Sequence, residues 1–286
     1  MPVSPLIELN TGARMPRLGL GVWQTGDDDT QRAVEAALEA GYRSVDTAAA
    51  YRNEAGVGRG IRAAGIPREE LFVTTKLWNS DRGRERPLRA IDASLERLGL
   101  DHVDLYLVHW PGGDPALRAE TWLAMQEIAA SGKAAAIGVC NYRPHHLQEI
   151  LDAGETVPAV NQVELHPHLP QWVTRAFDAD HGIVTESWSP LGGTSGSGWG
   201  DASRPNTLLD DRVIADIAAA HGVSPAQVLI RWHLQNGLVV IPKSSNPDRI
   251  RQNGDVFSFA LTGEDMERIA TLETGERVGS DPDDFV

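Results

Sequence analysis

From Arg17 onward the chain repeats a single unit, made of a short apolar run, a loop and an amphipathic helix. This alternation is the sequence form of βα units, which lay successive strands parallel in one sheet. Eight units follow one another without an interrupting linker, and that continuity favours closure into a barrel over an open doubly wound sheet. The sequence therefore predicts an α/β fold, a (β/α)8 TIM barrel, with residues 1–286 as a single domain.

The elements can be placed from the apolar periodicity and the turn residues. Strands are predicted near residues 17–21, 42–46, 72–76, 103–108, 135–140, 158–162, 182–186 and 238–241. Helices are predicted near residues 28–40, 53–63, 83–98, 116–130, 143–152, 170–179, 224–235 and 246–253. Ahead of the first unit, two short strands around a turn at residues 10–13 predict an N-terminal β-hairpin that plugs the bottom of the barrel.

Three further segments lie outside the repeat. Residues 191–200 are too rich in glycine for regular structure, which predicts a functional loop. Extra C-terminal helices are predicted over residues 210–221 and after Thr262, whose spacing to Asp265 fits a capping box. The polar tail at residues 277–285 is expected to loop over the barrel.

Polar residues stand where the apolar runs end, and such barrels place their active sites at the C-terminal ends of the strands. These residues are Asp46, Lys76, His109, Asn141, Gln162, Glu164, Ser187, Trp188 and Lys243. Lysine is kept at two of these positions, although the chain has only three lysines among its 26 basic residues. The succession predicts that these side chains share one face of the barrel.

Residues 41–54 read Gly-Tyr-Arg-Ser-Val-Asp-Thr-Ala-Ala-Ala-Tyr-Arg-Asn-Glu. The segment resembles the aldo-keto reductase signature, Gly-Tyr/Phe-Arg-x-x-Asp-Thr-Ala-x-x-Tyr-x-Asn-Glu, at every fixed position. The similarity runs over nearly the whole chain and looks closest to bacterial reductases of the 2,5-diketo-D-gluconic acid reductase type. It implies NADPH-dependent reduction of aldehydes and ketones to alcohols inside a (β/α)8 barrel.

The resemblance places a catalytic tetrad on Asp46, Tyr51, Lys76 and His109, with Tyr51 as the proton donor. A phenol in water titrates near pH ~10, too high for efficient proton exchange at neutral pH. An ammonium in contact favours the phenolate, so Lys76 is expected to lower the pKa of Tyr51 while Asp46 holds the ammonium in place. His109 is expected to orient the substrate carbonyl.

Tyrosine gives a proton but no hydride, so the reaction requires a nicotinamide, NADPH or NADP+. The resemblance assigns its carboxamide to Asn141 and Gln162 and its ring to Trp188, with Ser189 and Leu191 following in the same loop. Cys140 replaces the serine of the family, and a thiol is a poorer hydrogen-bond donor than a hydroxyl.

Residues 241–253 resemble the family's site for the adenosine 2'-phosphate and the adenine. Cations and hydroxyls near the start of a helix suit a phosphate. The residues expected to bind this part of the cofactor are Lys243, Ser244, Ser245, Arg249, Gln252 and Asn253. The glycine-rich loop is expected to close over the pyrophosphate.

Three tryptophans, Trp23, Trp78 and Trp110, follow predicted strands and are expected to line an aromatic substrate pocket around Tyr51 and His109. Such a pocket suits a small molecule that presents a carbonyl from an apolar or sugar-like body.

The composition restricts the partners. A net charge of −14 and a pI near 5.0 argue against nucleic acid and anionic membranes, which need clustered cations. Cys140 is the single cysteine, so no intrachain disulfide is possible, and no metal site is predicted. Without a visible secretory signal or membrane span, we expect a monomer in the cytoplasm.

Two other classes of function stay open at this stage. The family resemblance includes potassium-channel β subunits, which bind NADPH mainly as regulatory modules. A metal-dependent barrel hydrolase would need ligands beyond His166 and His168, and none is matched elsewhere. Residues 56–60, Gly-Val-Gly-Arg-Gly, lack the glycine spacing of a dinucleotide fingerprint and are interpreted as loose first turns of a helix.

Overall fold

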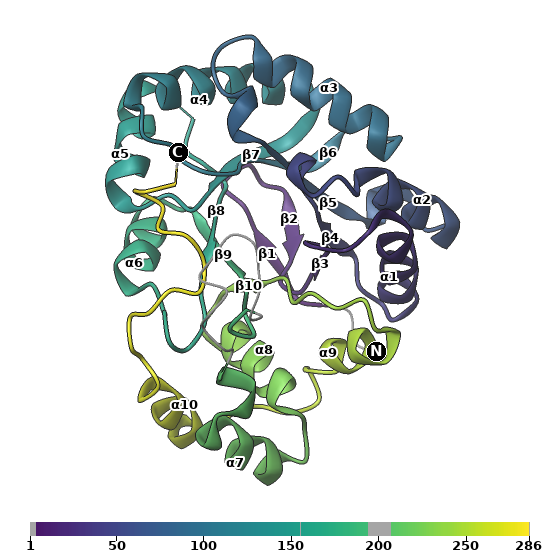
Figure 1. Ribbon diagram of the computed structural model, residues 1–286, viewed down its shortest axis with the longest axis vertical. Helices are drawn as coiled ribbons and strands as arrows, with labels where there is room; N and C mark the ends of the chain where they lie inside the picture. Colours follow the sequence, from purple (N-terminus) through teal and green to yellow (C-terminus); the bar gives the residue numbers. More distant parts are fainter. Residues whose placement is uncertain (1–3, 155, 194–206, 286) are drawn as a thin grey trace.

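The strands of the repeat form one parallel sheet that curls into a barrel (Figure 1). The computed structural model describes residues 4–154, 156–193 and 207–285. In order across the sheet the eight strands are β3 (Leu20–Gly21), β4 (Ser44–Asp46), β5 (Phe72–Leu77), β6 (Val103–Val108), β7 (Ala134–Cys140), β8 (Val160–Glu164), β9 (Val184–Trp188) and β10 (Val239–Val240). Parallel bridges join Leu18 to Val240 and Gly21 to Lys243, which closes the sheet on itself. The predicted (β/α)8 barrel is confirmed.

Helices surround the barrel (Figure 1). The repeat contributes α1 (Asp27–Glu39), α2 (Glu54–Ala64), α3 (Arg86–Leu98), α4 (Pro115–Ala130), α5 (Pro144–Ala153), α6 (Trp172–Asp180), α8 (Pro225–Gln235) and α9 (Pro247–Gly254). Both predicted extra helices are present, α7 (Arg212–His221) and α10 (Gly263–Ala270). The Thr262 capping box begins α10, where the hydroxyl accepts from the Asp265 amide at 3.1 Å. No single described helix could span a membrane, although α7 and α8 together, bent by 90°, pass the same test of length and composition.

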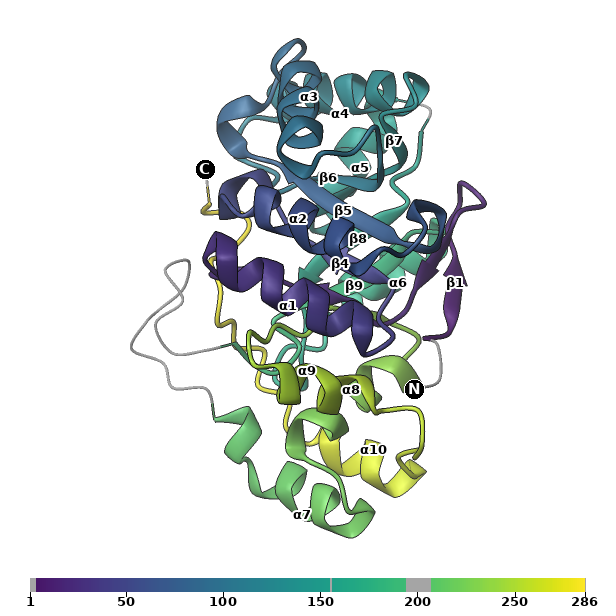
Figure 2. The same cartoon turned by 90° about the vertical axis from the view of Figure 1, so that its right-hand side faces the viewer.

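The N-terminal hairpin closes the bottom of the barrel, as predicted. Strands β1 (Leu6–Glu8) and β2 (Arg14–Pro16) pair antiparallel, and Figure 2 shows β1 at the opposite end from the C-terminus. Leu9 and Met15 belong to one buried cluster with interior residues of the barrel such as Leu105 and Val160. The lower half of the interior is therefore apolar and packed.

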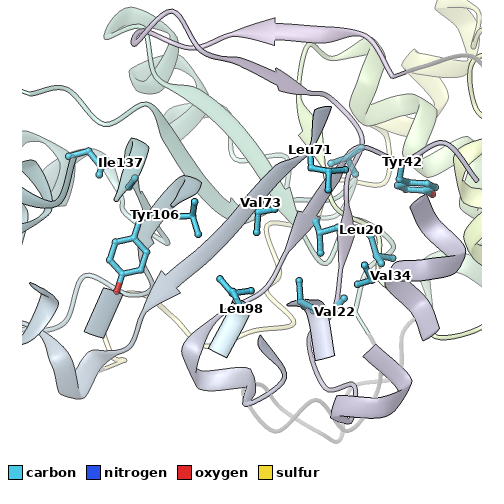
Figure 3. Packing of buried hydrophobic residues seen from close by; sticks show 14 of the residues in the cluster. Leu20, Val22, Val34, Tyr42, Leu71, Val73, Leu98, Tyr106 and Ile137 are labelled. Carbon is cyan, nitrogen blue, oxygen red and sulfur yellow. The ribbon is translucent and has the colours of Figure 1, made fainter. Parts of the chain in front are cut away.

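A second apolar layer lies between the sheet and the helices (Figure 3). Leu20 and Val73 from the strands pack in the same cluster as Val34 from α1 and Leu98 from α3. Each of these four side chains is at most 1% exposed. This packing fixes the strand ends above which the polar site is built.

The glycines at residues 56–60 have a role that the sequence interpretation missed. A Cβ on Gly56 would lie 2.1 Å from the Asp27 carbonyl oxygen, and one on Gly58 would lie 2.0 Å from that of Leu98. Both glycines are buried in α2. They are close-packing positions between α2 and its neighbours, not loose turns, because backbone occupies the space of a side chain.

We expect Gly58→Ala to lower the free energy of unfolding by about 1–3 kcal/mol, the usual cost of overpacking, despite the better helix propensity of alanine. Urea denaturation measures this change. Gly263→Ala, in α10, is the matched control, because no described atom outside its chain neighbours and its own helix backbone lies within 4 Å of the added methyl group. A Gly58→Ala protein as stable as the wild type would contradict the packing argument.

Candidate active site

A polar layer lies above the apolar floor of the barrel interior. Alternate residues of a strand point to opposite faces of its sheet, so every second side chain enters the barrel. Asp46, Lys76, Gln162 and Glu186 come from four different strands, are each at most 2% exposed, and are linked by hydrogen bonds. Since β4 and β8 are not neighbours in the sheet, the bond between Asp46 and Gln162 must cross the barrel interior.

The structure brings the four predicted tetrad side chains together. Lys76 Nζ donates to a carboxylate oxygen of Asp46 and to the Thr47 carbonyl oxygen at 2.9 Å. The same ammonium lies 3.4 Å from the hydroxyl of Tyr51, which a short 3-10 helix (Ala49–Tyr51) carries to the rim. The rings of Tyr51 and His109 meet edge to face, with their centroids 5.6 Å apart.

Burial and the ion pair decide the charge states of these groups. Burial lowers the pKa of Lys76, but the Asp46 carboxylate, together with Tyr51 and Cys140, outweighs it, so the pKa lies above its usual range and the ammonium stays charged. Burial, and then the charge of Lys76, holds the pKa of His109 well below its usual range, so this imidazole is neutral at pH 7.

The expected net lowering of the pKa of Tyr51 is wrong. Burial raises the pKa and outweighs the opposing effect of the Lys76 ammonium. The phenol therefore keeps its proton at neutral pH. The Lys76 ammonium lowers the free-energy cost of removing that proton, because it lies beside the oxygen that would carry the negative charge of the phenolate.

A cavity of about 310 Å3 opens above the tetrad. The predicted site residues that line it are Trp23, Asp46, Tyr51, His109, Trp110, Asn141, Gln162, Trp188, Ser189, Leu191, Lys243, Ser244, Arg249, Gln252 and Asn253. Other predicted site residues lie outside the cavity lining. Lys76 is buried beneath the cavity floor, with 0% of its surface exposed. Trp78 packs edge to face against His109, with the ring centroids 5.2 Å apart. Ser245 is exposed and is not part of the lining.

Asn141 connects two walls of this cavity. Its backbone is left-handed, with φ of 64°, and its side chain donates to the His109 carbonyl oxygen at 3.0 Å. Its amide oxygen accepts from the indole nitrogen of Trp188 at 2.8 Å, so the residue holds the Trp188 ring in place. Cys140, the preceding residue, points its sulfur at the Gln162 amide oxygen, 3.9 Å away.

The far end of the cavity is basic. Lys243 and Arg249 form no ion pair with another described residue, whereas Arg251 pairs with Asp248 at 3.1 Å and lies 3.6 Å from Glu39. Asn246 caps α9 by accepting from the amides of Asp248 and Arg249. Lys243 and Arg249 therefore line the cavity with no carboxylate paired to them in the part of the chain that the structure describes, as an anionic ligand requires.

The C-terminal tail forms part of the site, and sequence reasoning expected only a loop across the barrel. Buried Glu164 accepts from the backbone amides of Val278 at 2.5 Å and Gly279 at 3.0 Å. Both of these tail residues line the cavity. At the end of the tail, the Phe285 ring lies 4.3 Å from that of Trp110 and 6.3 Å from that of Trp78. The tail thus adds a fourth aromatic ring to the predicted tryptophans.

Arg143 fastens this tail to the start of α5. Its guanidinium bonds the Asp281 carboxylate at 2.7 Å and also pairs with Asp283. The Arg143 amide donates to His146 Nδ1 at 3.2 Å, which leaves the proton on Nε2, 3.3 Å from Asp283. His145, His146 and Asp283 are grouped closely enough to hold a metal ion, but this tautomer makes His146 a donor to the carboxylate.

His166 and His168, considered as hydrolase ligands, serve other contacts. The Nε2 atom of His166 lies 3.1 Å from buried Glu164, and the His168 carbonyl oxygen accepts from the amides of Thr274 and Gly275. His166 therefore holds Glu164, the residue that binds the tail, and His168 binds the backbone just before the tail. The glycine-rich loop expected over the pyrophosphate lies mostly outside the described residues, which resume at 207.

Known proteins resemble this chain over nearly its whole length. Residues 17–274 match the model of the "Aldo/keto reductase family". Morphine 6-dehydrogenase of Pseudomonas putida is 53% identical over 283 residues, covering 98% of this chain and 95% of the relative. Methylglyoxal reductase DkgA of Escherichia coli K12 is 48% identical over 280 residues and covers 98% of both chains.

Solved structures are equally similar. A variant of Gox0644 in complex with NADPH has a TM-score of 0.90 and 44% identity, covering 99% of both chains. The aldo-keto reductase of Bombyx mori in complex with NADP has a TM-score of 0.89 and 36% identity, covering 98% of this chain and 96% of that one.

We expect Arg143→Gln to speed hydrogen exchange at the amides of Val278 and Gly279 by about two- to thirtyfold, because it removes two partly exposed ion pairs, each worth about 0.2–1 kcal/mol. Exchange followed by mass spectrometry or NMR measures this change. Arg59→Gln is the control, since Arg59 also bonds two aspartates, Asp27 and Asp28, both in α1. Equal exchange in the Arg143 variant and the wild type would mean that the tail needs no such fastening.

Proposed function

This chain belongs to the aldo/keto reductase family, and from that premise we propose that it reduces aldehyde and ketone groups to alcohols with NADPH. It is an NADP-dependent oxidoreductase. The observation that carries the proposal is the buried Lys76 ammonium, which lies between the Asp46 carboxylate and the phenol of Tyr51 at the floor of a cavity. A buried ammonium next to a phenol stabilises the phenolate, which is what proton donation by Tyr51 requires.

The shape and chemistry of the cavity fit the cofactor. Trp188 offers a ring held by Asn141, and Gln162 lines the same cavity. At the other end, Lys243 and Arg249 provide cations for the 2'-phosphate, with Ser244, Gln252 and Asn253 beside them. When bound, NADPH supplies the hydride. We propose these residues as its contacts, and Ser245 stays a prediction from the sequence.

The remaining chemistry belongs to the protein. Tyr51, protonated at neutral pH, donates its proton to the carbonyl oxygen, and Lys76 stabilises the phenolate that remains. Asp46 holds Lys76 in position. Neutral His109 offers an N–H donor to the same carbonyl oxygen and orients it toward Tyr51. The aromatic rings of Trp23, Trp110 and Phe285 exclude water from the carbonyl.

The alternative of a regulatory module that binds NADPH without turnover is not favoured. Pure binding would not need a buried ammonium aimed at a phenol on the cavity floor, since desolvating that charge carries a cost. We propose a small-molecule carbonyl as substrate, presented from an apolar or sugar-like body. A single domain, a monomeric state and a cytoplasmic location remain our predictions from the sequence.

Tyr51→Phe should remove most of the turnover and keep NADPH binding, because only the proton donor is lost. General acid catalysis contributes about a hundred- to ten-thousandfold. Loss of NADPH absorbance with a panel of aldehydes measures turnover, and fluorescence titration measures binding. Tyr106→Phe is the control, since that buried hydroxyl has no hydrogen-bond partner among the described residues. Near-normal turnover in Tyr51→Phe would refute the assignment.

Arg249→Ala should weaken NADPH binding and leave NADH binding nearly unchanged. A charge-assisted hydrogen bond is worth roughly 1.5–3 kcal/mol, or about ten- to over a hundredfold in Kd. Arg251→Ala, in the same helix but paired with Asp248 and Glu39, is the matched control. Equal losses for the two cofactors in Arg249→Ala would argue against a 2'-phosphate site there.

A further inference from the structure

A second carboxyl group lies beside the tetrad and has no role in the mechanism above. Glu186 sits in the middle of β9, two residues before Trp188, and is 0% exposed. The Nε2 atom of Gln162 donates to Glu186 Oε2 at 2.8 Å and to Asp46 Oδ2 at 2.8 Å. One amide group therefore bridges the tetrad carboxylate and Glu186.

The titratable groups that act on Glu186 come from strands that do not pair with β9. They are the carboxylate of Asp46 on β4, the ammonium of Lys76 on β5 and the neutral thiol of Cys140 on β7. Its partner on the β10 side is apolar Val239. Lys76 already pairs with Asp46. An ionised Glu186 would thus be a second negative charge in a dry interior with one cation.

The other carboxyl oxygen supports the same assignment. Glu186 Oε1 is buried and has no hydrogen-bond partner among the described residues. A charged oxygen left without donors in such a place costs far more than a hydroxyl. The one hydrogen bond that the Glu186 side chain accepts from a described residue, Gln162, is compatible with the neutral acid.

We propose that Glu186 is held as an uncharged acid and is a positioning residue, which fixes the amide of Gln162 so that its oxygen faces the cofactor. Both amide hydrogens are committed, one to the Asp46 carboxylate and one to the Glu186 acid. Gln162 Oε1, which accepts a weak hydrogen bond from the Cys140 thiol at 3.9 Å, can still accept a second one from a ligand. A flipped amide would turn that oxygen toward the Asp46 carboxylate, and the two would repel. Gln162 would accordingly accept from the carboxamide N–H of nicotinamide, which rests on the proposed function.

If the reaction needs Glu186 uncharged, the ionisation of Glu186 sets an upper pH limit for kcat. Burial, followed by the nearby Asp46 carboxylate, raises the pKa of Glu186 to about 8. Below that pH the group is neutral, and above it a second negative charge appears near Lys76 and Asp46. That charge makes a phenolate at Tyr51 costlier, since like charges repel. The kcat for reduction should fall as pH rises through this range.

Glu186→Gln tests the limit because it keeps the size and the acceptor but cannot ionise. The alkaline limb of kcat should move to higher pH by about one unit or more, as expected when a titrating group is removed. Asp178→Asn is the matched control. Burial raises the pKa of Asp178 to about 7, but its side-chain partners among the described residues are Asn161 and Thr185, not Gln162 or a tetrad residue. An unmoved limb in Glu186→Gln would overturn the proposal.

Glu186→Leu tests the positioning, since it removes the acceptor of Gln162. The Kd for NADPH, from fluorescence titration, should rise about two- to tenfold, the loss of one hydrogen bond. Glu186→Gln should recover most of that affinity. If both variants bind NADPH like the wild type, Glu186 does not position Gln162.

An infrared titration separates this proposal from the proposed function. The carbonyl stretch of protonated carboxyl groups should be present at neutral pH in the wild type, with contributions from Glu186 and Asp178. The Glu186 band should be missing in Glu186→Gln and kept in Asp178→Asn. This readout needs no substrate or turnover. A protein that reduces no carbonyl but shows the band would fail only the proposed function, and an active protein without the band would fail only this inference.

Discussion

The burial of Lys76 beside Asp46 is the constraint on which the site depends. Taking an ammonium and a carboxylate out of water costs several kcal/mol per ion, and their attraction repays this only when further hydrogen bonds complete the geometry. Here those bonds come from the Thr47 carbonyl oxygen and from the Gln162 amide. Such a pair adds little to stability, so its presence at the floor of a cavity is best explained by chemistry.

The barrel makes this burial possible by stacking an apolar layer under a polar one. Every second side chain of a strand points into the barrel, so Phe72 and Lys76, four residues apart on β5, both enter the interior. Phe72 belongs to the apolar layer and Lys76 to the polar one. The hairpin seals the apolar end through Leu9 and Met15. The packed apolar layer lies below the ion pair, and Asp46 lines the cavity above it.

Segments distant in sequence complete the cavity wall. Glu164 holds the backbone of the tail at Val278 and Gly279, while Arg143 holds its carboxylates. The last ring of the tail, Phe285, then lies against Trp110. One wall of the cavity thus depends on polar anchors away from the reacting atoms, the buried Glu164 and the partly exposed Arg143.

The sequence by itself determined the barrel, the hairpin and the strand-end residues, because apolar periodicity and the 41–54 signature are local patterns. The sequence also indicates the orientation of Glu186. It lies two residues before Trp188 on the same strand, so both side chains point to the same face, the barrel interior. Only the tertiary structure decided that burial outweighs Lys76 at Tyr51, that Gln162 joins two carboxyls, and that glycines at 56 and 58 meet backbone. Desolvation, crossing hydrogen bonds and close approaches are set by chain segments far apart in sequence, which no local pattern encodes.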